Sequence, residues 1–80
     1  MPKLKSLDSK EIIKILESFG FEIFSQKGSH IKMVRQTLIQ KQVLTLPNHK
    51  NVDKGTLKAI YNQASKFVSG TELENHFYTK

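Results

Sequence analysis

Apolar residues recur at helical spacing in two stretches of this chain, and a segment of alternating residues separates them. The apolar positions are Ile12, Ile13, Leu16 and Phe19 in the first stretch and Leu57, Ile60, Tyr61 and Ala64 in the second. Spacings of three and four residues place such side chains on one face of a helix. The pattern therefore predicts one helix over about residues 9–18 and another that runs from Asp53 to about Phe67 or Val68.

Polar residues and one glycine mark where these helices begin and end. Asp8 and Glu11 have the spacing of a capping box, in which each side chain accepts a hydrogen bond from the other residue's backbone N–H. Asp53 has the residue type of an N-cap for the second helix. Gly20 is expected to end the first helix, because glycine readily adopts the left-handed conformation that follows a helix.

The segment between the helices has the composition of a β-hairpin followed by a third strand. Residues 21–26 and 31–35 are rich in β-branched and aromatic side chains, and Lys27-Gly28 supplies a turn between them. A loop over residues 36–40 leads to a third strand at about 41–46, which ends at Pro47-Asn48.

Alternation along the strands divides their side chains between two faces of the sheet. Ile31 and Met33 face one side, whereas His30, Lys32 and Val34 face the other. If the helices cover the side of Ile31, then His30 lies on the open face. The same alternation places Phe21 and Ile23 on the covered face and Glu22 and Phe24 on the open face.

The last part of the chain has a helical pattern of its own. Ser69-Gly70 interrupts the second helix, and Thr71 with Glu74 predicts a capped terminal helix that carries Leu73 and Phe77. The element order is thus α-β-β-β-α, with a core over about residues 7–68 and a C-terminal appendix over 69–80. We predict a single α+β domain over residues 1–80, with two helices on one face of a three-stranded antiparallel sheet.

Composition and charge narrow the range of functions. The chain has no cysteine, which excludes disulfides and thiolate metal sites. The N-terminal lysines are not followed by an apolar run, and no segment approaches the roughly 20 apolar residues of a membrane span. We therefore expect a soluble, cytoplasmic domain without a signal peptide. Thirteen Lys and Arg against seven Asp and Glu give a formal net charge of +6, which favours a polyanionic partner such as nucleic acid.

His30 is the candidate for catalysis, because a free histidine titrates at a pKa of about 6.5 and exchanges protons at cellular pH. It follows Gly28-Ser29 at the junction of a turn and a strand. From the residues alone, a surface histidine beside a turn is the simpler interpretation. Ser29 suits either a phosphate contact or the turn, and Gly28 suits a left-handed turn conformation.

Four short motifs in series give the sequence a family resemblance. They are Gly20-Phe21, Gln26-Lys27-Gly28-Ser29-His30, Thr45-Leu46-Pro47-Asn48-His49 and Lys54-Gly55-Thr56-Leu57-Lys58-Ala59-Ile60. In this order the chain resembles the HicA-type toxins. The resemblance implies a fold like the double-stranded-RNA-binding domain, ribonuclease activity on messenger RNA, and a HicB-type antitoxin that covers the active face. It assigns catalysis to the histidine of the Gly-Ser-His motif, which is His30.

The expected function is that of a metal-independent endoribonuclease without a cofactor, in which the ribose 2′-hydroxyl attacks the adjacent phosphate. His30 would act as general base or general acid. Ser29, Lys32 and His49 are auxiliary candidates, and the second proton-transfer group stays open between His49 and Lys32. The residues expected to contact RNA are Lys27, Gly28, Lys50, Lys54 and Lys58.

Two other classes of function fit the same sequence. A non-catalytic RNA-binding module of the same fold would use the lysines to hold phosphates by shape. A protein-interaction domain would use the charge for solubility or for an acidic partner. A metal site is not expected, because His30, His49 and Asp53 lack the short spacing of a ligand set. His76 is expected to be a solvated residue of the terminal segment.

Overall fold

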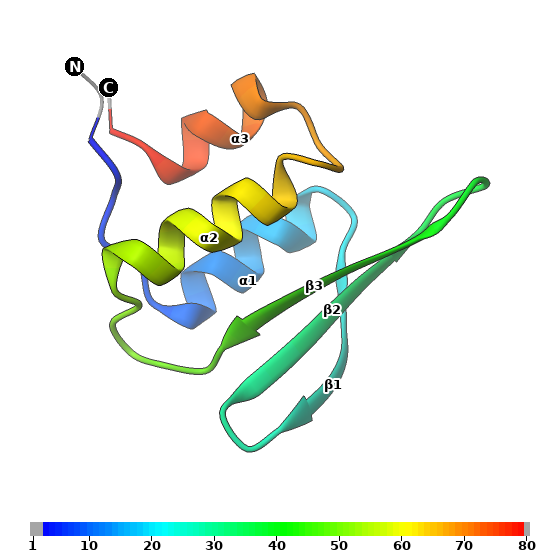
Figure 1. The fold of residues 1–80 in the computed structure, drawn as a ribbon, viewed down its shortest axis with the longest axis horizontal. Coiled ribbons are helices and arrows are strands. Elements are labelled where there is room, and N and C mark those ends of the chain that lie inside the picture. The colour runs from blue at the N-terminus through cyan, green and yellow to red at the C-terminus, as the bar shows by residue number, and fades with distance from the viewer. Residues whose placement is uncertain (1–2, 80) are drawn as a thin grey trace.

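The computed structural model describes residues 3–79 and contains three helices and three strands (Figure 1). In chain order they are α1 (Ser9–Ser18), β1 (Glu22–Lys27), β2 (His30–Gln36), β3 (Lys41–Pro47), α2 (Lys54–Ala64) and α3 (Gly70–Phe77). This order confirms the predicted α+β class and its α-β-β-β-α core with a terminal helix. Met1, Pro2 and Lys80 of the predicted domain lie outside the described residues. Within residues 3–79, no helix has the length and hydrophobicity that crossing a membrane requires.

The three strands form one antiparallel sheet in the order β1-β2-β3. The first turn brings Lys27 opposite His30, and the second brings Gln36 opposite Lys41. Alternation along β2 and β3 buries four apolar side chains and Gln42 on the face that the helices cover; the apolar ones are Ile31, Met33, Leu44 and Leu46. The exposed position of His30 on the other side of β2 is confirmed.

Strand β1 departs from simple alternation. A register shift between Ile23 and Ser25 forms a β-bulge, so Phe24 has no partner on β2. Phe24 nevertheless lies on the open face, where the Nζ of Lys41 is 4.8 Å from the centroid of its ring. Ile23 pairs with Met33 on the covered side but is 49% exposed. All six residues of β1 are exposed, because the helical layer covers β2 and β3 but not this strand.

Helix α1 begins and ends as the sequence predicts. The Glu11 N–H donates to Oδ1 of Asp8 at 2.8 Å, and the Asp8 N–H donates to Oε1 of Glu11 at 3.1 Å, which completes the capping box. Phe19 is the C-cap, and Gly20 follows it with a φ of +97°, in the region that favours glycine.

Helix α2 ends at Ala64, so the predicted end at Phe67 or Val68 is wrong. The chain continues as turns in which the Phe67 and Val68 N–H groups both donate to the Ala64 carbonyl. The Phe67 carbonyl instead accepts a hydrogen bond from Arg35 on β2. The helical periodicity of the sequence extends through this segment, whereas the helix ends at Ala64 and the turn that follows is bonded to the sheet.

The terminal helix α3 begins earlier than predicted. Its N-cap is Ser69, whose side chain accepts a hydrogen bond from the Glu72 N–H. The capping box predicted between Thr71 and Glu74 is therefore wrong by two residues. Gly70, which was expected only to interrupt the second helix, is the first residue of α3.

Helix α3 contributes to the hydrophobic core. Leu73 and Phe77 are fully buried, as members of the same cluster as the residues of the sheet. Tyr61 of α2 packs edge-to-face against the rings of Phe77 and Tyr78, with centroids 5.7 and 5.3 Å away. Leu4 and Tyr78 form an isolated bridge that brings the two ends of the described chain together (Figure 1). The segment 69–79 thus completes the core that the other elements begin.

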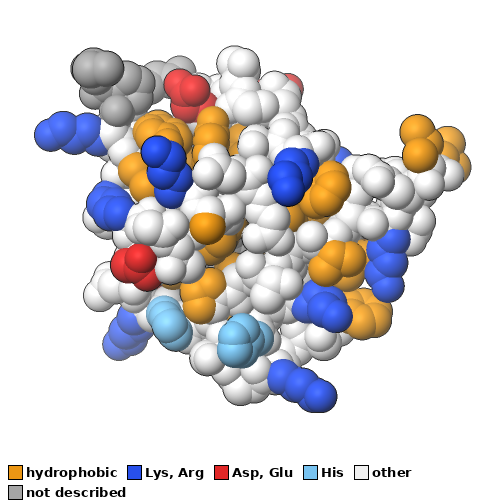
Figure 2. Space-filling model, in the orientation of Figure 1, with side chains coloured by type: hydrophobic (Ala, Val, Ile, Leu, Met, Phe, Trp, Pro, Cys, Tyr) orange, Lys and Arg blue, Asp and Glu red, His pale blue; other side chains and the backbone are white. Residues whose placement is uncertain are grey.

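The β2–β3 hairpin extends past the helices (Figure 1). Leu38 and Ile39 lie in its turn and are fully exposed, and Figure 2 shows hydrophobic side chains at this tip. The Thr37 hydroxyl closes the turn by accepting from the Gln40 N–H at 3.0 Å and donating to the Gln40 carbonyl at 2.9 Å.

Arg35 of β2 connects the sheet to the ends of two helical segments. Its Nη1 donates to the Phe19 carbonyl at 2.8 Å, and its Nη2 donates to the Phe67 carbonyl at 2.9 Å. Its Nε donates to Oε1 of Gln42 on β3 at 2.7 Å. The guanidinium carbon lies 5.0 Å from the centroid of the Phe21 ring. One side chain thereby satisfies three acceptors in three different elements.

Arg35→Lys is expected to lower the free energy of unfolding by about 3 kcal/mol, because an ammonium group cannot reach three acceptors at once. Urea unfolding followed by circular dichroism measures the change. Lys32→Ala, on the same strand but exposed, is the matched control and should change stability by no more than about 0.5 kcal/mol. If the two variants unfold at the same urea concentration, the guanidinium does not hold the helix ends.

Candidate functional site

A shallow pocket of about 260 Å³ lies where the start of β2, the end of β3 and the start of α2 meet. Its lining residues are His30, Thr45, Leu46, Pro47, His49, Asp53 and Thr56. Two histidines from different segments are thus brought to one pocket, and Figure 2 shows two histidine side chains close together on this part of the surface. The volume is below the roughly 300–1,000 Å³ that is typical of small-molecule binding pockets.

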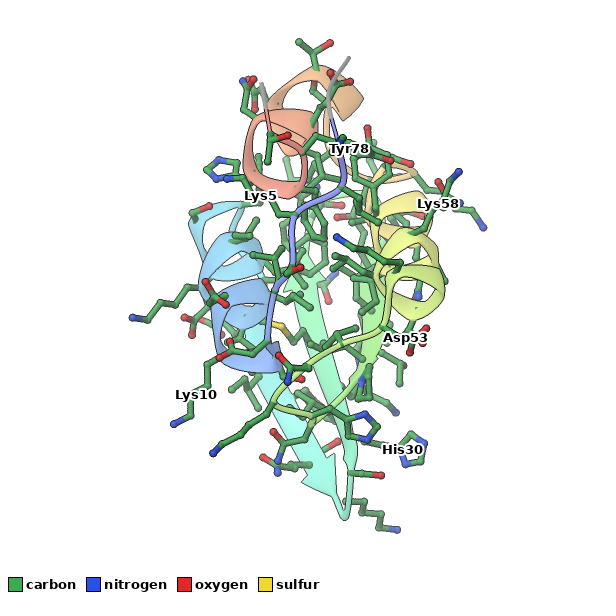
Figure 3. All side chains as sticks on the ribbon, turned by 90° about the vertical axis from the view of Figure 1, so that its left-hand side faces the viewer. Lys5, Lys10, His30, Asp53, Lys58 and Tyr78 are labelled. Atoms are coloured by element: carbon green, nitrogen blue, oxygen red, sulfur yellow. The ribbon has the colours of Figure 1, made fainter. Side chains whose placement is uncertain are left out.

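His30 is held by the sheet on both sides. It is the first residue of β2 and pairs with Lys27 of β1 and with Pro47 of β3. Gly28, at a φ of +58°, permits the tight turn that precedes it. The side chain is exposed at the end of the sheet, where Figure 3 shows it on the same side of the molecule as Asp53. A histidine on a paired strand is held in place more rigidly than one on a free loop.

His49 lies in the loop between β3 and α2, and hydrogen bonds fix the backbone around it. Its N–H donates to Oγ of Ser9 at 2.8 Å, and its carbonyl accepts from the Ser9 N–H at 3.0 Å. The Ser9 hydroxyl in turn donates to the Pro47 carbonyl. The Asn48 N–H donates to the Ser29 carbonyl at 2.7 Å. The loop is therefore tied to the start of α1 on one side and to the β1–β2 turn on the other.

Ser9 is a residue that the sequence analysis missed. It is 2% exposed and belongs to α1, yet its hydrogen bonds go to residues about 40 positions later in the chain. In the sequence it looks like any polar residue beside a helix cap. Ser29, which directly precedes His30, holds the loop through its backbone carbonyl, which accepts the hydrogen bond from the Asn48 N–H.

Asp53 and Thr56 form the α2 side of the pocket. The Thr56 hydroxyl donates to Oδ1 of Asp53 at 2.7 Å, and the Thr56 N–H donates to Oδ2 at 3.0 Å. These bonds hold the pKa of the Asp53 carboxyl below its usual value, and the bond from the Thr56 hydroxyl has the largest effect. Asp53 is the N-cap of α2, as predicted, and the lowered pKa favours its ionised form.

The pocket gathers His30, His49 and Asp53, although no motif or regular spacing in the sequence connects them. In the part of the chain that the structure describes, no group of three histidine, aspartate or glutamate side chains is arranged to hold a metal ion. The three side chains share the pocket wall without forming a ligand set.

A second depression, of about 210 Å³, lies on the α1 side of His49. It is lined by Asp8, Ser9, Lys10, Asn48, His49 and Lys50. His49 thus borders both depressions, and Lys10 and Lys50 supply positive charge on the α1 side. Lys10 was not among the predicted RNA contacts, because an exposed lysine at the start of a helix gives no distinguishing signal in a sequence.

The other predicted lysines do not form one cluster. Lys27 lies opposite His30 across the first turn. Lys32 pairs with Thr45 on β3, two residues along β2 from His30, and is not part of the pocket lining. The Nζ of Lys54 donates to the Leu4 carbonyl at 2.5 Å. Lys58 is exposed on α2, and Figure 3 shows it far from His30.

Comparison with known protein families decides the identity of the chain. A model of the family described as the HicA toxin of bacterial toxin–antitoxin systems matches residues 9–65. The chain belongs to the HicA toxin family. The match spans more than two thirds of the 80 residues and includes His30, His49 and Ser9. The family resemblance seen in the sequence is therefore confirmed, and a toxin of such a system has an antitoxin as partner. No curated protein and no solved structure matches the chain.

The open sheet face of this HicA-family toxin has an apolar centre. Phe24 is 62% exposed and Val43 is 37% exposed, and the half-buried Val34 pairs with Val43 on the same face. Lys32 and Lys41 flank these residues along β2 and β3, and Lys41 lies over the Phe24 ring. We call Phe24, Val34 and Val43 the open-face patch.

Proposed function

We propose that this HicA-family toxin is a metal-independent endoribonuclease that cleaves messenger RNA in the cytoplasm. The observation that carries the proposal is the pocket that His30 and His49 line together at the end of the sheet. The net charge of +6 supports a polyanionic substrate. Membership of a toxin family supports an activity that harms the cell that contains it.

Metal-free cleavage of RNA requires two proton transfers. The ribose 2′-hydroxyl attacks the adjacent phosphorus and loses its proton, while the bond to the 5′ oxygen breaks and that oxygen gains a proton. The products are a 2′,3′-cyclic phosphate and a 5′-hydroxyl. His30 carries out one of these transfers, a contribution of about 10²–10⁴-fold in rate. Lys27, its neighbour on β1, stabilises the negative charge that develops on the phosphate.

A non-catalytic RNA-binding module of the same fold is the alternative. Such a module holds phosphates by shape and charge, for which lysines suffice. A pocket lined by two histidines favours the enzyme, because binding alone gives no reason for proton-transfer groups at this place. The two functions differ in outcome: the module binds RNA and releases it unchanged.

His30→Ala is expected to lower the rate of RNA cleavage by about 10²–10⁴-fold and to relieve growth inhibition, because one proton transfer is lost. Purified protein is incubated with RNA in EDTA, and the products are separated and tested for a cyclic phosphate. His76→Ala, which removes an exposed histidine of α3, is the matched control and should cleave at the normal rate.

The fold of His30→Ala should persist, since the side chain is exposed and contributes little to the core. Binding without cleavage by the unmodified protein would favour the RNA-binding module. A requirement for Mg²⁺ would contradict the metal-independent mechanism.

The path of the RNA is proposed to follow His49 toward the start of α1. Lys10 and Lys50 line the depression next to His49, whereas the Lys54 ammonium is already bonded to the Leu4 carbonyl. Lys58 lies further along α2 (Figure 3). An RNA strand whose reacting phosphate is at His30 therefore passes closer to Lys10 and Lys50 than to Lys54 and Lys58.

Replacing Lys10 and Lys50 by glutamine is expected to flatten the salt dependence of RNA binding. Each lost phosphate contact reduces the slope of log affinity against log salt concentration by roughly one. Fluorescence anisotropy with labelled RNA measures the slope, in a His30→Ala background that prevents cleavage. The pair Lys54→Gln and Lys58→Gln is the control with the same charge change. A larger effect from this control pair would put the RNA along α2.

The antitoxin is proposed to bind the open-face patch. An exposed apolar centre with charged residues at its rim has the composition of a standard protein interface. Because lysines flank the patch, the complementary surface is acidic, and association with it is accelerated at low salt. Since His30 and Lys32 lie on the same face of β2, a bound partner reaches the pocket edge.

Phe24→Glu is expected to weaken binding of the antitoxin by about 30-fold or more, because buried aromatic residues often dominate an interface. The product of the adjacent reading frame, as the candidate antitoxin, is co-expressed and purified, and its affinity is measured by calorimetry. Leu38→Glu makes the same kind of change at the exposed hairpin tip and should alter affinity by less than about twofold. The reverse result would show that the antitoxin binds the hairpin tip.

A further inference from the structure

We infer that His49 is the second proton-transfer group of the pocket and that Ser9 is the residue that positions it. The inference rests on the proposed ribonuclease function. It starts from the juxtaposition of His30, on a paired strand, with His49, on a loop whose backbone is fixed by a buried serine.

The chemistry needs two groups in opposite protonation states. One group accepts the proton of the 2′-hydroxyl as the new P–O bond forms, and the other gives a proton to the 5′ oxygen as the old P–O bond breaks. The protons balance, and no oxidant, reductant or further reactant is consumed. Imidazole groups suit this need, because histidine is the side chain whose ordinary change of protonation lies closest to neutral pH.

Apart from the two histidines, Asp53 is the acidic or basic side chain in the pocket lining, and it does not supply a proton. Asp53 is an ionised N-cap whose oxygens accept from Thr56, and the Thr56 hydroxyl is used in that bond. Lys32, the competing candidate from the sequence, is not part of the lining. His49 remains as the partner of His30. The charged groups that surround His49 are Asp53 on the α2 side, Asp8 and Lys10 on α1 and its cap, and Lys50 in its own loop.

The Ser9 hydroxyl holds the His49 loop by acting as donor and acceptor together. It donates to the Pro47 carbonyl and accepts from the His49 N–H, while the Ser9 backbone N–H donates to the His49 carbonyl. Loops are ordinarily more mobile than the elements they connect. Here both backbone groups of His49 are bonded to one residue that is 2% exposed. These bonds fix the backbone position from which the His49 imidazole projects. Its placement matters, because misplacement by about 1 Å can cost about 10²-fold in rate.

The test compares His49→Gln and His30→Gln on two RNA substrates. The first is an ordinary oligonucleotide, and the second has sulfur in place of the 5′ bridging oxygen at the cleavage site. A thiolate leaves without being protonated, so the second substrate makes the general acid unnecessary. Both variants should lose about 10²–10⁴-fold in kcat on the ordinary substrate, with little change in KM. On the sulfur substrate one variant should recover most of this loss and the other should not. His76→Gln is the control with the same residue change and should cleave both substrates normally.

Ser9 is tested by its coupling to His49. Ser9→Ala should lower kcat by about 10- to 100-fold, and Ser9→Thr, which keeps the hydroxyl, should recover part of that loss. In a His49→Gln background, Ser9→Ala should have almost no further effect, because there is no imidazole left to position. A purely structural serine would lower activity equally in both backgrounds, and that result would overturn the positioning role.

Three further outcomes separate this inference from the proposed function. Normal cleavage by His49→Gln, with a large loss in His30→Gln, would overturn the inference and leave the ribonuclease intact. Failure of the sulfur substrate to recover either variant would also overturn it. Absence of cleavage by the unmodified protein would remove the proposed function and this inference together.

Discussion

The guanidinium group of Arg35 is the interaction on which the relative placement of helices and sheet depends. The segments that end α1 and follow α2 each present a carbonyl group toward the sheet, and a carbonyl without a donor at such a place destabilises a fold. Arg35 donates to both, at Phe19 and Phe67, and its third bond reaches Gln42 on β3. Glycine at position 20 fits the same arrangement, because a Cβ there would lie 3.2 Å from Cδ of Arg35.

Helix α1 is fixed at its other end by Ser9, and this second attachment builds the candidate site. Its ten residues span about 15 Å, so the Arg35 bonds and the Ser9 bonds hold opposite ends of one rigid element. The loop with His49 is attached to Ser9, and the turn before His30 is attached to the same loop through Ser29 and Asn48. The same set of backbone hydrogen bonds thus holds both histidines in place, although one lies on a strand and the other on a loop. In a domain of this size, such backbone attachments hold two groups in register from different segments.

Local chemistry explains which features the sequence predicted. The capping box of Asp8 and the N-cap at Asp53 depend on residues three positions away, and the exposure of His30 depends on strand alternation. The features that were missed depend on residues distant in the chain. The bulge at Phe24 lies on a strand that the helices leave uncovered, and the end of α2 involves a bond from Arg35. His49 was a candidate in the sequence, but the fold alone determines that it shares a pocket with His30.

The pocket and the open-face patch meet at β2, and this gives the proposed inhibition a physical basis. His30 and Lys32 are the first two open-face positions of that strand, and Val34 of the patch is the next. In the proposed arrangement RNA enters beside His49 and ends at His30, whereas the proposed protein partner on the patch approaches His30 along the strand from the other direction. The net charge of +6 attracts anionic partners of either kind, so on this proposal an acidic antitoxin competes with RNA for the same positively charged surface. On this proposal a partner inhibits without inserting any group into the pocket, because a protein that covers the end of β2 also covers the proposed phosphate position beside His30.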